Sequence, residues 1–353
     1  MKILFEHDYL YYLPQFEPIV RWFMKHGKHE IFLSLNESVS KLEKKIFKQE
    51  CNRLSLEGIH ANFEPQRRRI LKEMNFDLIF FGNKSSLSAI RNKSSFCIMV
   101  YHGIGLKQSY YKDLSKEMDL ICVESKERAS ELSEKGFEAV ATGFTKLDLL
   151  KLDYHKSNDY DTLLYAPTFF PSSLQKTIPF LSDYKNVNIK IKLHHFYWTH
   201  NYYARIREQL AQAINSLPNI QIVPFEQYSI LPLFEAADVL ISDYSSTLFE
   251  FLHLNRPIIQ TDYYSLRLKY KLFPKLLEKR LDTSRKSQIN FTEICDKPEN
   301  LWQICQESLR DPERLEKERS FAKDKFLGSS DGNATNRLIQ YLNEIGIPIG
   351  AAC

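Results

Sequence analysis

The sequence predicts an α/β protein with two doubly wound, Rossmann-like halves, each built on its own parallel sheet, and a cleft between them. Short apolar segments rich in Ile, Val and Phe alternate with segments of helical periodicity, which is typical of parallel sheets covered by helices. This alternation stops at a polar stretch near the middle of the chain and then begins again. A length of 353 residues also suits two domains.

The first half carries six short strand candidates bounded by turn residues. They are residues 2–7, 30–35, 77–82, 96–102, 119–125 and 139–143. A helix is predicted over 124–136, because Ser125 is a suitable N-cap and Gly136 stands where a helix should end. The polar segment "KLDLLKLDYHKSNDYD" (146–161) is interpreted as a linker.

The second half repeats the alternation of strands and helices. Its strand candidates are residues 162–168, 187–195, 220–225, 238–244 and 257–262. Helices are predicted around 199–217, 226–237 and 246–254, and from about residue 297 the chain is mostly helical. In such sheets ligands bind beyond the carboxyl ends of the strands, which is where functional side chains are expected.

Composition excludes several functional classes. No run of 18 apolar residues is present, so no transmembrane helix is expected, and the N-terminus reads as a first strand, not a signal peptide. Six scattered cysteines without a C-x-x-C pair argue against a zinc site and a disulfide framework, and they fit a reducing cytosol. A net charge of +4 is too small to indicate a nucleic-acid partner.

Two local clusters of Lys and Arg are more informative than the net charge. They lie at 41–53 and 67–72, both in the first half. One interpretation is two solvated helix faces. The other is a surface that meets anionic lipid or an anionic polymer.

The stretch "ISDYSSTLFEF" (241–251) places polar side chains directly after a buried strand. Asp243 falls at the carboxyl end of that strand, and the hydroxyls of Ser245, Ser246 and Thr247 follow it. A helix N-terminus with added hydroxyl donors is a good seat for phosphate. The alternative is that these residues only cap and turn the chain.

Two features refine the interpretation of this stretch. Thr247 and Glu250 have the T-x-x-E spacing of a capping box, which predicts that they cap the helix and leave both serines to a ligand. Glu250 lies one turn into the helix, where a carboxylate can reach the ribose hydroxyls of a bound nucleotide.

A second candidate site is "MVYHGIGLKQSYYKD" (99–113). His102 leaves a strand end into a loop that contains Gly103 and Gly105, which let the backbone approach a ligand closely, and Lys107 follows. A histidine in this position suits a general base, because its pKa lies near working pH. The alternative is a purely structural histidine.

A third candidate site is "KIKLHHFYW" (190–198). His194 stands at a strand end, Lys192 lies on the same side by the period of two, and His195 points the other way. Here too the alternative is a histidine satisfied within the core. Two further strand-end loops contain Thr168 and Lys146, and either can touch a ligand.

These segments resemble the motifs of the CDP-glycerol glycerophosphotransferase family, which are teichoic-acid-type polyol phosphate transferases. The resembling segments are "HGIGLK" (102–107), "GFTKLD" (143–148), "LYAPTF" (164–169), "KLHH" (192–195), "ADVLISDYSSTLFEFLHLNRPIIQ" (237–260) and "DGNATNR" (331–337). The resemblance runs from about residue 99 to 340. Departures from the motifs, such as Ile104–Gly105 and Glu250, leave the donor open between CDP-glycerol, CDP-ribitol and another activated polyol phosphate.

The resemblance implies a GT-B fold and a division of labour. Residues 1–150 would form an acceptor-side domain, residues 151–330 the nucleotide-donor domain, and residues 331–353 a helix that returns toward the first domain. An acceptor hydroxyl would attack the donor's β-phosphorus, with CMP leaving. No cofactor is expected, and the sequence has no acidic cluster that demands a metal.

The resemblance also assigns roles to residues. His102 would take the acceptor's proton, and His194 would hold the pyrophosphate and stabilise developing charge. Ser245 and Ser246 would bind phosphate, and Glu250 would fix the ribose. The remaining expected donor contacts are Gly103, Lys146, Thr168, Lys192 and Asp243.

The expected partners are a nucleotide-activated polyol and a lipid-linked or polymeric acceptor, with the enzyme cytoplasmic and peripheral at the inner face of the membrane. Two alternatives remain open. One is a GT-B nucleotide-sugar glycosyltransferase or a relative of UDP-sugar 2-epimerase, which would bind uridine in place of cytidine nucleotides. The other is an inactive scaffold, against which the pair His102 and His194 argues.

Overall fold

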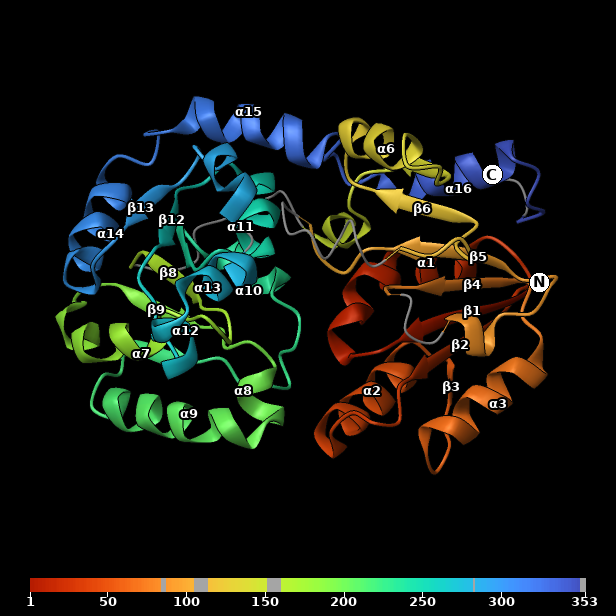
Figure 1. The fold of residues 1–353 in the computed structure, drawn as a ribbon, viewed down its shortest axis with the longest axis horizontal. Helices are drawn as coiled ribbons and strands as arrows, with labels where there is room; N and C mark the ends of the chain where they lie inside the picture. The colour runs from red at the N-terminus through yellow and green to blue at the C-terminus, as the bar shows by residue number, and fades with distance from the viewer. Residues whose placement is uncertain (84–86, 105–113, 151–159, 282, 350–353) are drawn as a thin grey trace. The chain divides into compact units, whose positions relative to one another are not determined.

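The computed structural model describes residues 1–83, 87–104, 114–150, 160–281 and 283–349. These residues form two compact units, which we call the first and the second unit (Figure 1). The first unit takes in 1–104, 114–150 and 325–349, and the second takes in 160–324. The division near the C-terminus falls at 324/325, a few residues before the expected boundary at 330/331.

The first unit is built on a parallel sheet with the strand order β3-β2-β1-β4-β5-β6-β7. Its strands are β1 (Lys2–His7), β2 (Glu30–Leu35), β3 (Glu57–Ile59), β4 (Leu78–Phe81), β5 (Phe96–Val100), β6 (Leu120–Val123) and β7 (Ala139–Ala141). In the centre, Phe5 of β1 pairs with Leu33 of β2 on one side and Phe80 of β4 on the other. These central strands are buried on both faces, which explains their continuous apolar sequences.

Helices cover this first sheet. They are η1 (Leu10–Tyr12), α1 (Leu13–Lys25), α2 (Lys41–Arg53), α3 (Glu64–Met74), α4 (Leu87–Ile90), α6 (Lys126–Ser133), η2 (Thr145–Leu149) and α16 (Ala334–Glu344). Ser125 caps α6 as expected, because its hydroxyl accepts the Arg128 N–H at 3.3 Å. Gly136 follows the helix with a φ of +79°, a conformation that favours glycine.

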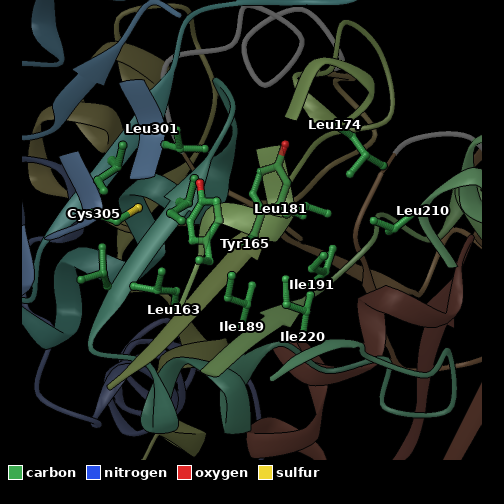
Figure 2. Close-up of a cluster of buried hydrophobic side chains, with 14 of the residues drawn as sticks. Leu163, Tyr165, Leu174, Leu181, Ile189, Ile191, Leu210, Ile220, Leu301 and Cys305 are labelled. Atoms are coloured by element: carbon green, nitrogen blue, oxygen red, sulfur yellow. The ribbon is translucent and has the colours of Figure 1, made fainter. Parts of the chain in front are cut away.

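The second unit contains another parallel sheet, with the order β10-β9-β8-β11-β12-β13. Its strands are β8 (Thr162–Ala166), β9 (Asn188–Ile191), β10 (Ile220–Ile222), β11 (Val239–Ser242), β12 (Ile258–Thr261) and β13 (Glu293–Cys295). Figure 2 shows part of its core, where Tyr165 and Ile191 on the strands pack with Leu210 and Cys305 on helices. The doubly wound α/β architecture predicted from the sequence is therefore confirmed for both units.

The connections of the second unit are mostly short helices. They are α7 (Leu174–Thr177), η3 (Ile178–Asp183), α8 (Phe196–Thr199), α9 (Asn201–Ile214), α10 (Leu231–Ala236), α11 (Ser246–Phe251), η4 (Leu252–Leu254), α12 (Leu268–Leu272), α13 (Pro274–Leu281), η5 (Thr283–Gln288), η6 (Pro298–Asn300) and α14 (Leu301–Arg310). The helix α15 (Glu316–Leu327) begins in this unit and ends in the first.

Two details of the predicted organisation are wrong. The edge strands β3 and β13 were not expected, because each has only three residues and neither is a clear apolar run. The expected linker at 146–161 begins inside η2, where Leu147 is buried in the first unit. Of the rest of that segment, residues 151–159 lie outside the described residues.

The basic cluster at 67–72 is only in part the exposed surface that the sequence suggests, because Arg69 is exposed whereas Arg67 is not. Arg67 is fully buried and forms ion pairs at 2.7 Å with Glu6 on β1 and Glu64 on α3. Arg68 also pairs with Glu64, at 2.7 Å. The buried Glu6 requires a partner in this low-dielectric setting, and Arg67 supplies the charge and the hydrogen bonds.

A buried histidine makes stability depend on pH. His7 at the end of β1 donates its Nδ1–H to the carbonyls of Phe5 and Ser34, both at 3.0 Å, and its ring packs edge-on against Phe16 and Phe47. Burial lowers the pKa of His7 to about 4. The unfolded chain, in which the pKa is about 6.5, therefore takes up a proton at a higher pH than the folded protein does.

We expect this part of the stability to be complete above about pH 6.5 and to fall as pH drops toward 4, by roughly 3 kcal/mol in total. Chemical denaturation of the wild type and of His7→Asn between pH 7.5 and 4.5 measures the effect. The variant keeps an N–H donor but cannot titrate, so its stability should fall less steeply. Parallel curves for the two proteins would show that His7 is not the cause.

Candidate active site

The first candidate residue, His102, lies just beyond the carboxyl end of β5 in the first unit. Its Nδ1 is 3.4 Å from the carbonyl oxygen of Gly82, which follows β4. A carbonyl can only accept, so Nδ1 carries the proton in this bond, and the neutral ring presents its lone pair at Nε2. That arrangement suits a general base.

The imidazole of His102 is held in place by aromatic side chains. The ring of Tyr12 stacks on it with a centroid distance of 4.7 Å and an interplanar angle of 11°, and Tyr11 meets it edge-on at 5.5 Å. Tyr12 is buried and accepts a hydrogen bond from Asn83 Nδ2 at 3.3 Å. A Cβ on Gly82 would lie 2.7 Å from the Tyr12 ring, so only glycine permits this approach.

Two further expected ligand contacts lie in the first unit. Gly103 is buried next to His102, and Lys146 lies half-buried in η2. The turn that carries Lys146 is fixed by Thr145, whose hydroxyl donates to the carbonyl of Gln15 at 2.7 Å. Gly105 and Lys107, which were singled out in the loop after His102, lie outside the described residues.

The segments 143–148 and 331–337 hold the C-terminal helix on the first unit. The carboxylate of Asp148 accepts the N–H groups of Ala334 and Thr335 at the start of α16, at 3.0 and 2.7 Å. Arg337 donates from Nε to the carbonyl of Thr142 at 2.6 Å and pairs with Asp331. These polar residues are thus engaged in holding α16 in the fold.

In the second unit, Asp243 at the end of β11 is the centre of a buried network. One carboxylate oxygen accepts the N–H and the hydroxyl of Thr168 at 2.7 and 2.9 Å. The other accepts the Ser173 N–H at 3.1 Å and the Thr261 hydroxyl at 2.7 Å. Burial raises the pKa of Asp243, while these bonds oppose the rise. With 1% of Asp243 exposed, this geometry favours positioning over direct ligand contact for both Asp243 and Thr168.

The hydroxyl cluster differs from the expected capping box. The N-cap of α11 is Ser245, and its side chain makes no capping bond. The Thr247 and Ser245 hydroxyls instead each lie 2.9 Å from Ser242 Oγ, which donates to the Ala166 carbonyl at 2.6 Å. The capping-box prediction is therefore wrong, and α11 begins without a side-chain cap on its N–H groups.

Ser246 and Glu250 differ in how accessible their side chains are to a ligand. The Ser246 hydroxyl is half-buried and makes no side-chain hydrogen bond within the described part of the chain. Glu250, one turn further along α11, is 1% exposed. Ser246 is therefore the better placed of the two to meet a ligand, and the ribose contact of Glu250 stays a prediction.

His194 and Lys192 lie beyond the carboxyl end of β9. His194 Nδ1 accepts the Phe196 N–H at 3.3 Å, so the neutral ring carries its proton on Nε2 and can donate there. Phe169, from the loop after β8, packs on its ring at 4.6 Å. Lys192 is half-buried and donates to the Gln227 carbonyl at 2.5 Å.

Several residues of the two clusters were not singled out from the sequence. Tyr12 and Asn83 support His102, whereas Ser173 and Thr261 serve Asp243. All four follow a strand or lie at its end, so searching every carboxyl end would have found them. Chain position alone did not indicate which neighbours they would contact.

No helix among the described residues is long and apolar enough to cross a membrane. Within the same residues, no group of three or more His, Cys, Asp or Glu side chains is placed to hold a metal ion.

Comparison with solved structures shows the same fold in several proteins. The wall teichoic acid polymerase TagF aligns with a TM-score of 0.64 at 15% identity, covering 98% of this chain and 88% of that one. The UDP-GlcNAc 2-epimerase from Neisseria meningitidis, bound to UDP-GlcNAc, aligns with a TM-score of 0.62 at 12% identity, covering 98% and 100%. At these identities the likeness establishes the GT-B fold alone.

Sequence comparison goes further than the fold. The teichoic acid glycerol-phosphate primase of Bacillus subtilis (strain 168) is 26% identical over an alignment of 315 residues, and the match covers 77% of this chain and 74% of that protein. The family model of CDP-Glycerol:Poly(glycerophosphate) glycerophosphotransferase matches residues 46–344. The chain therefore belongs to the CDP-glycerol:poly(glycerophosphate) glycerophosphotransferase family.

Proposed function

We propose that this protein transfers a polyol phosphate from a CDP-polyol to an acceptor hydroxyl and releases CMP. The observation that carries the proposal is the end of β11, where the Ser246 hydroxyl and the uncapped start of α11 lie inside the matched family region. Exposed N–H groups and hydroxyls at a helix start bind phosphate well. Family membership supplies the nucleotide and the class of reaction.

In the proposed reaction the acceptor oxygen forms a bond to the donor's β-phosphorus while the bond from that phosphorus to the CMP oxygen breaks. His102 takes the acceptor's proton at Nε2, the nitrogen left without a proton by the bond to Gly82. The electron pair of the broken bond leaves on CMP. Such transfers depend chiefly on positioning and charge stabilisation.

The donor would bind to the second unit. Ser245 and Ser246 seat the pyrophosphate, and His194 donates from Nε2 to the charge that develops on it. Lys192 adds a positive charge close to the same strand end. Glu250 fixes the ribose if its buried carboxylate becomes accessible on binding. Gly103 and Lys146, both in the first unit, are proposed as further donor contacts.

The proposal includes an acceptor and a location. We propose a lipid-linked or polymeric acceptor of cell-surface polymer synthesis, and an enzyme that is cytoplasmic and peripheral at the inner membrane face. The proposal is supported by two similar proteins, a teichoic acid glycerol-phosphate primase and a wall teichoic acid polymerase. CDP-glycerol and CDP-ribitol are the two donors to compare.

Calorimetric titration with CDP-glycerol, CDP-ribitol and UDP-GlcNAc tests the donor assignment. The epimerase with the same fold makes the uridine nucleotide the relevant competitor. We expect one of the cytidine compounds to bind at least tenfold more tightly than UDP-GlcNAc, about 1.4 kcal/mol or more. Tighter binding of UDP-GlcNAc would favour an epimerase-like or glycosyltransferase activity.

The substitution Ser246→Ala tests whether the hydroxyl contributes to donor binding or to the stability of the fold. Each hydrogen bond to a charged phosphate contributes about 1.5–3 kcal/mol, so donor affinity should drop by about one to two decades. The melting temperature should hardly change, because the hydroxyl makes no side-chain bond to another described residue. Loss of stability with unchanged donor binding would identify the serine as a structural residue only.

A further inference from the structure

The segment between β12 and β13 carries an exposed apolar surface. Leu268, Leu272, Phe273 and Leu276, on α12 and α13 and the turn between them, are 47–70% exposed. A single exposed leucine is ordinary in a folded protein. Four large apolar side chains exposed within nine residues are typical of an interaction surface.

The same segment is strongly basic. Arg267, Lys269, Lys271 and Lys275 are all exposed, and no acidic residue occurs between Asp262 and Glu278. Within the described part of the chain, none of these four cations forms an ion pair with a carboxylate. The surface therefore combines apolar side chains with uncompensated positive charge. We call residues 267–276 the basic–apolar segment.

Aromatic contacts connect the basic–apolar segment to the body of the second unit. The Arg267 guanidinium lies 4.5 Å from the ring centroid of Phe170, in the loop after β8, and 4.4 Å from that of Tyr202 on α9. Tyr270 packs on Phe170 at 5.1 Å. The segment thus borders a loop at the carboxyl end of the second sheet.

We propose that the basic–apolar segment docks the protein on a bilayer that contains anionic lipids. Leucine and phenylalanine side chains would enter the boundary between headgroups and acyl chains, while lysine and arginine would meet the phosphates. Long basic side chains can do both, because their stems lie along apolar surface and their charges reach the headgroups. The proposal rests on the proposed function only where it supposes an acceptor held in a membrane.

Charge complementarity selects a lipid surface over a second copy of this chain. Two copies meeting through this face would bring eight uncompensated cations together, whereas an anionic bilayer neutralises them. The two clusters first considered for lipid contact fit less well. Arg67 is buried, and in α2 Lys44 and Arg53 are ion-paired with glutamates.

Co-sedimentation with vesicles tests the proposal. Vesicles of pure phosphatidylcholine are compared with vesicles containing phosphatidylglycerol, at low and at high salt. We expect the wild-type chain to bind the anionic vesicles and to be released as salt screens the charges. The double variants Lys271→Glu/Lys275→Glu and Leu272→Glu/Phe273→Glu should each weaken binding by about tenfold or more.

Two control variants match these changes elsewhere. Lys45→Glu/Lys48→Glu makes the same charge change on exposed positions of α2, and Phe321→Glu replaces an exposed phenylalanine on α15. Both should bind anionic vesicles within about twofold of the wild type. Unchanged circular dichroism confirms the fold of every variant, since all the replaced side chains are exposed.

Three results would overturn the proposal. They are no binding of the wild type to anionic vesicles, an equal loss in the α2 control, and a wild-type dimer that Leu272→Glu/Phe273→Glu converts to a monomer. Titration with CDP-glycerol in the absence of lipid reports on the proposed function separately. A chain that binds vesicles but no CDP-polyol would leave the docking surface standing and refute the function.

Discussion

The variant His102→Ala is expected to lose transfer activity by about 10²–10⁴-fold, because a general base typically contributes that much to the rate. Its affinity for CDP-glycerol should stay within about twofold, since the proposed donor contacts are mainly in the second unit. Steady-state kinetics and calorimetric titration measure the two quantities. A variant that loses donor affinity and keeps its turnover would contradict the assignment of His102 as base.

A matched histidine provides the control for this experiment. His26, at the end of α1, also stacks on an aromatic ring, that of Trp22 at 4.5 Å, and its Nδ1 is 3.0 Å from a carbonyl oxygen. It lies away from the carboxyl ends of the strands, so His26→Ala should leave transfer unchanged. The variant Tyr12→Leu, which removes the stack on His102, should lower the transfer rate without affecting CDP-glycerol affinity.

The second large effect is expected for Asp243→Ala. Removing the carboxylate leaves the buried N–H groups of Thr168 and Ser173 without their acceptor. The hydroxyls of Thr168 and Thr261 can still donate to backbone carbonyls nearby. Each unsatisfied buried polar group costs about 1–3 kcal/mol, so the free energy of unfolding should fall by roughly 3 kcal/mol or more. Donor affinity should fall as well, because the loops after β8, β11 and β12 lose their common anchor.

Chemical denaturation and donor titration separate the two contributions of Asp243. The exposed carboxylate of Asp183, in the same unit, offers a control, and Asp183→Ala should change neither quantity appreciably. If Asp243→Ala abolished donor binding while its stability stayed within about 0.5 kcal/mol of the wild type, the range of ordinary surface substitutions, the carboxylate would be a direct ligand contact.

The sequence located the two strand ends that carry His102 and Asp243, because short apolar runs identify buried parallel strands, and within each sheet the carboxyl ends of such strands share an edge. The burial of Arg67 and its ion pair with β1 could not be predicted in the same way. The arginines of an Arg-rich helix normally face solvent, and the burial of this one depends on Glu6, which is distant in the chain.

The hydroxyl cluster illustrates a second limit of sequence reasoning. The spacing of Thr247 and Glu250 fits a capping box, yet the N-cap is decided by the residue at which the backbone turns, which is Ser245. Ser242, inside the strand, then engages the Ser245 and Thr247 hydroxyls. The T-x-x-E spacing rule cannot predict the contacts of Ser242, because they depend on the angle at which the chain passes from β11 into α11.

The most direct test of the account follows radiolabelled CDP-glycerol incubated with the protein and membranes from a teichoic-acid-producing bacterium. We expect CMP to be released and labelled glycerol phosphate to appear in the membrane fraction, with both signals lost in His102→Ala. CDP-ribitol, tested in parallel, identifies the polyol. Conversion of UDP-GlcNAc to its 2-epimer or its transfer to an acceptor, with no CMP released from either cytidine compound, would contradict the account.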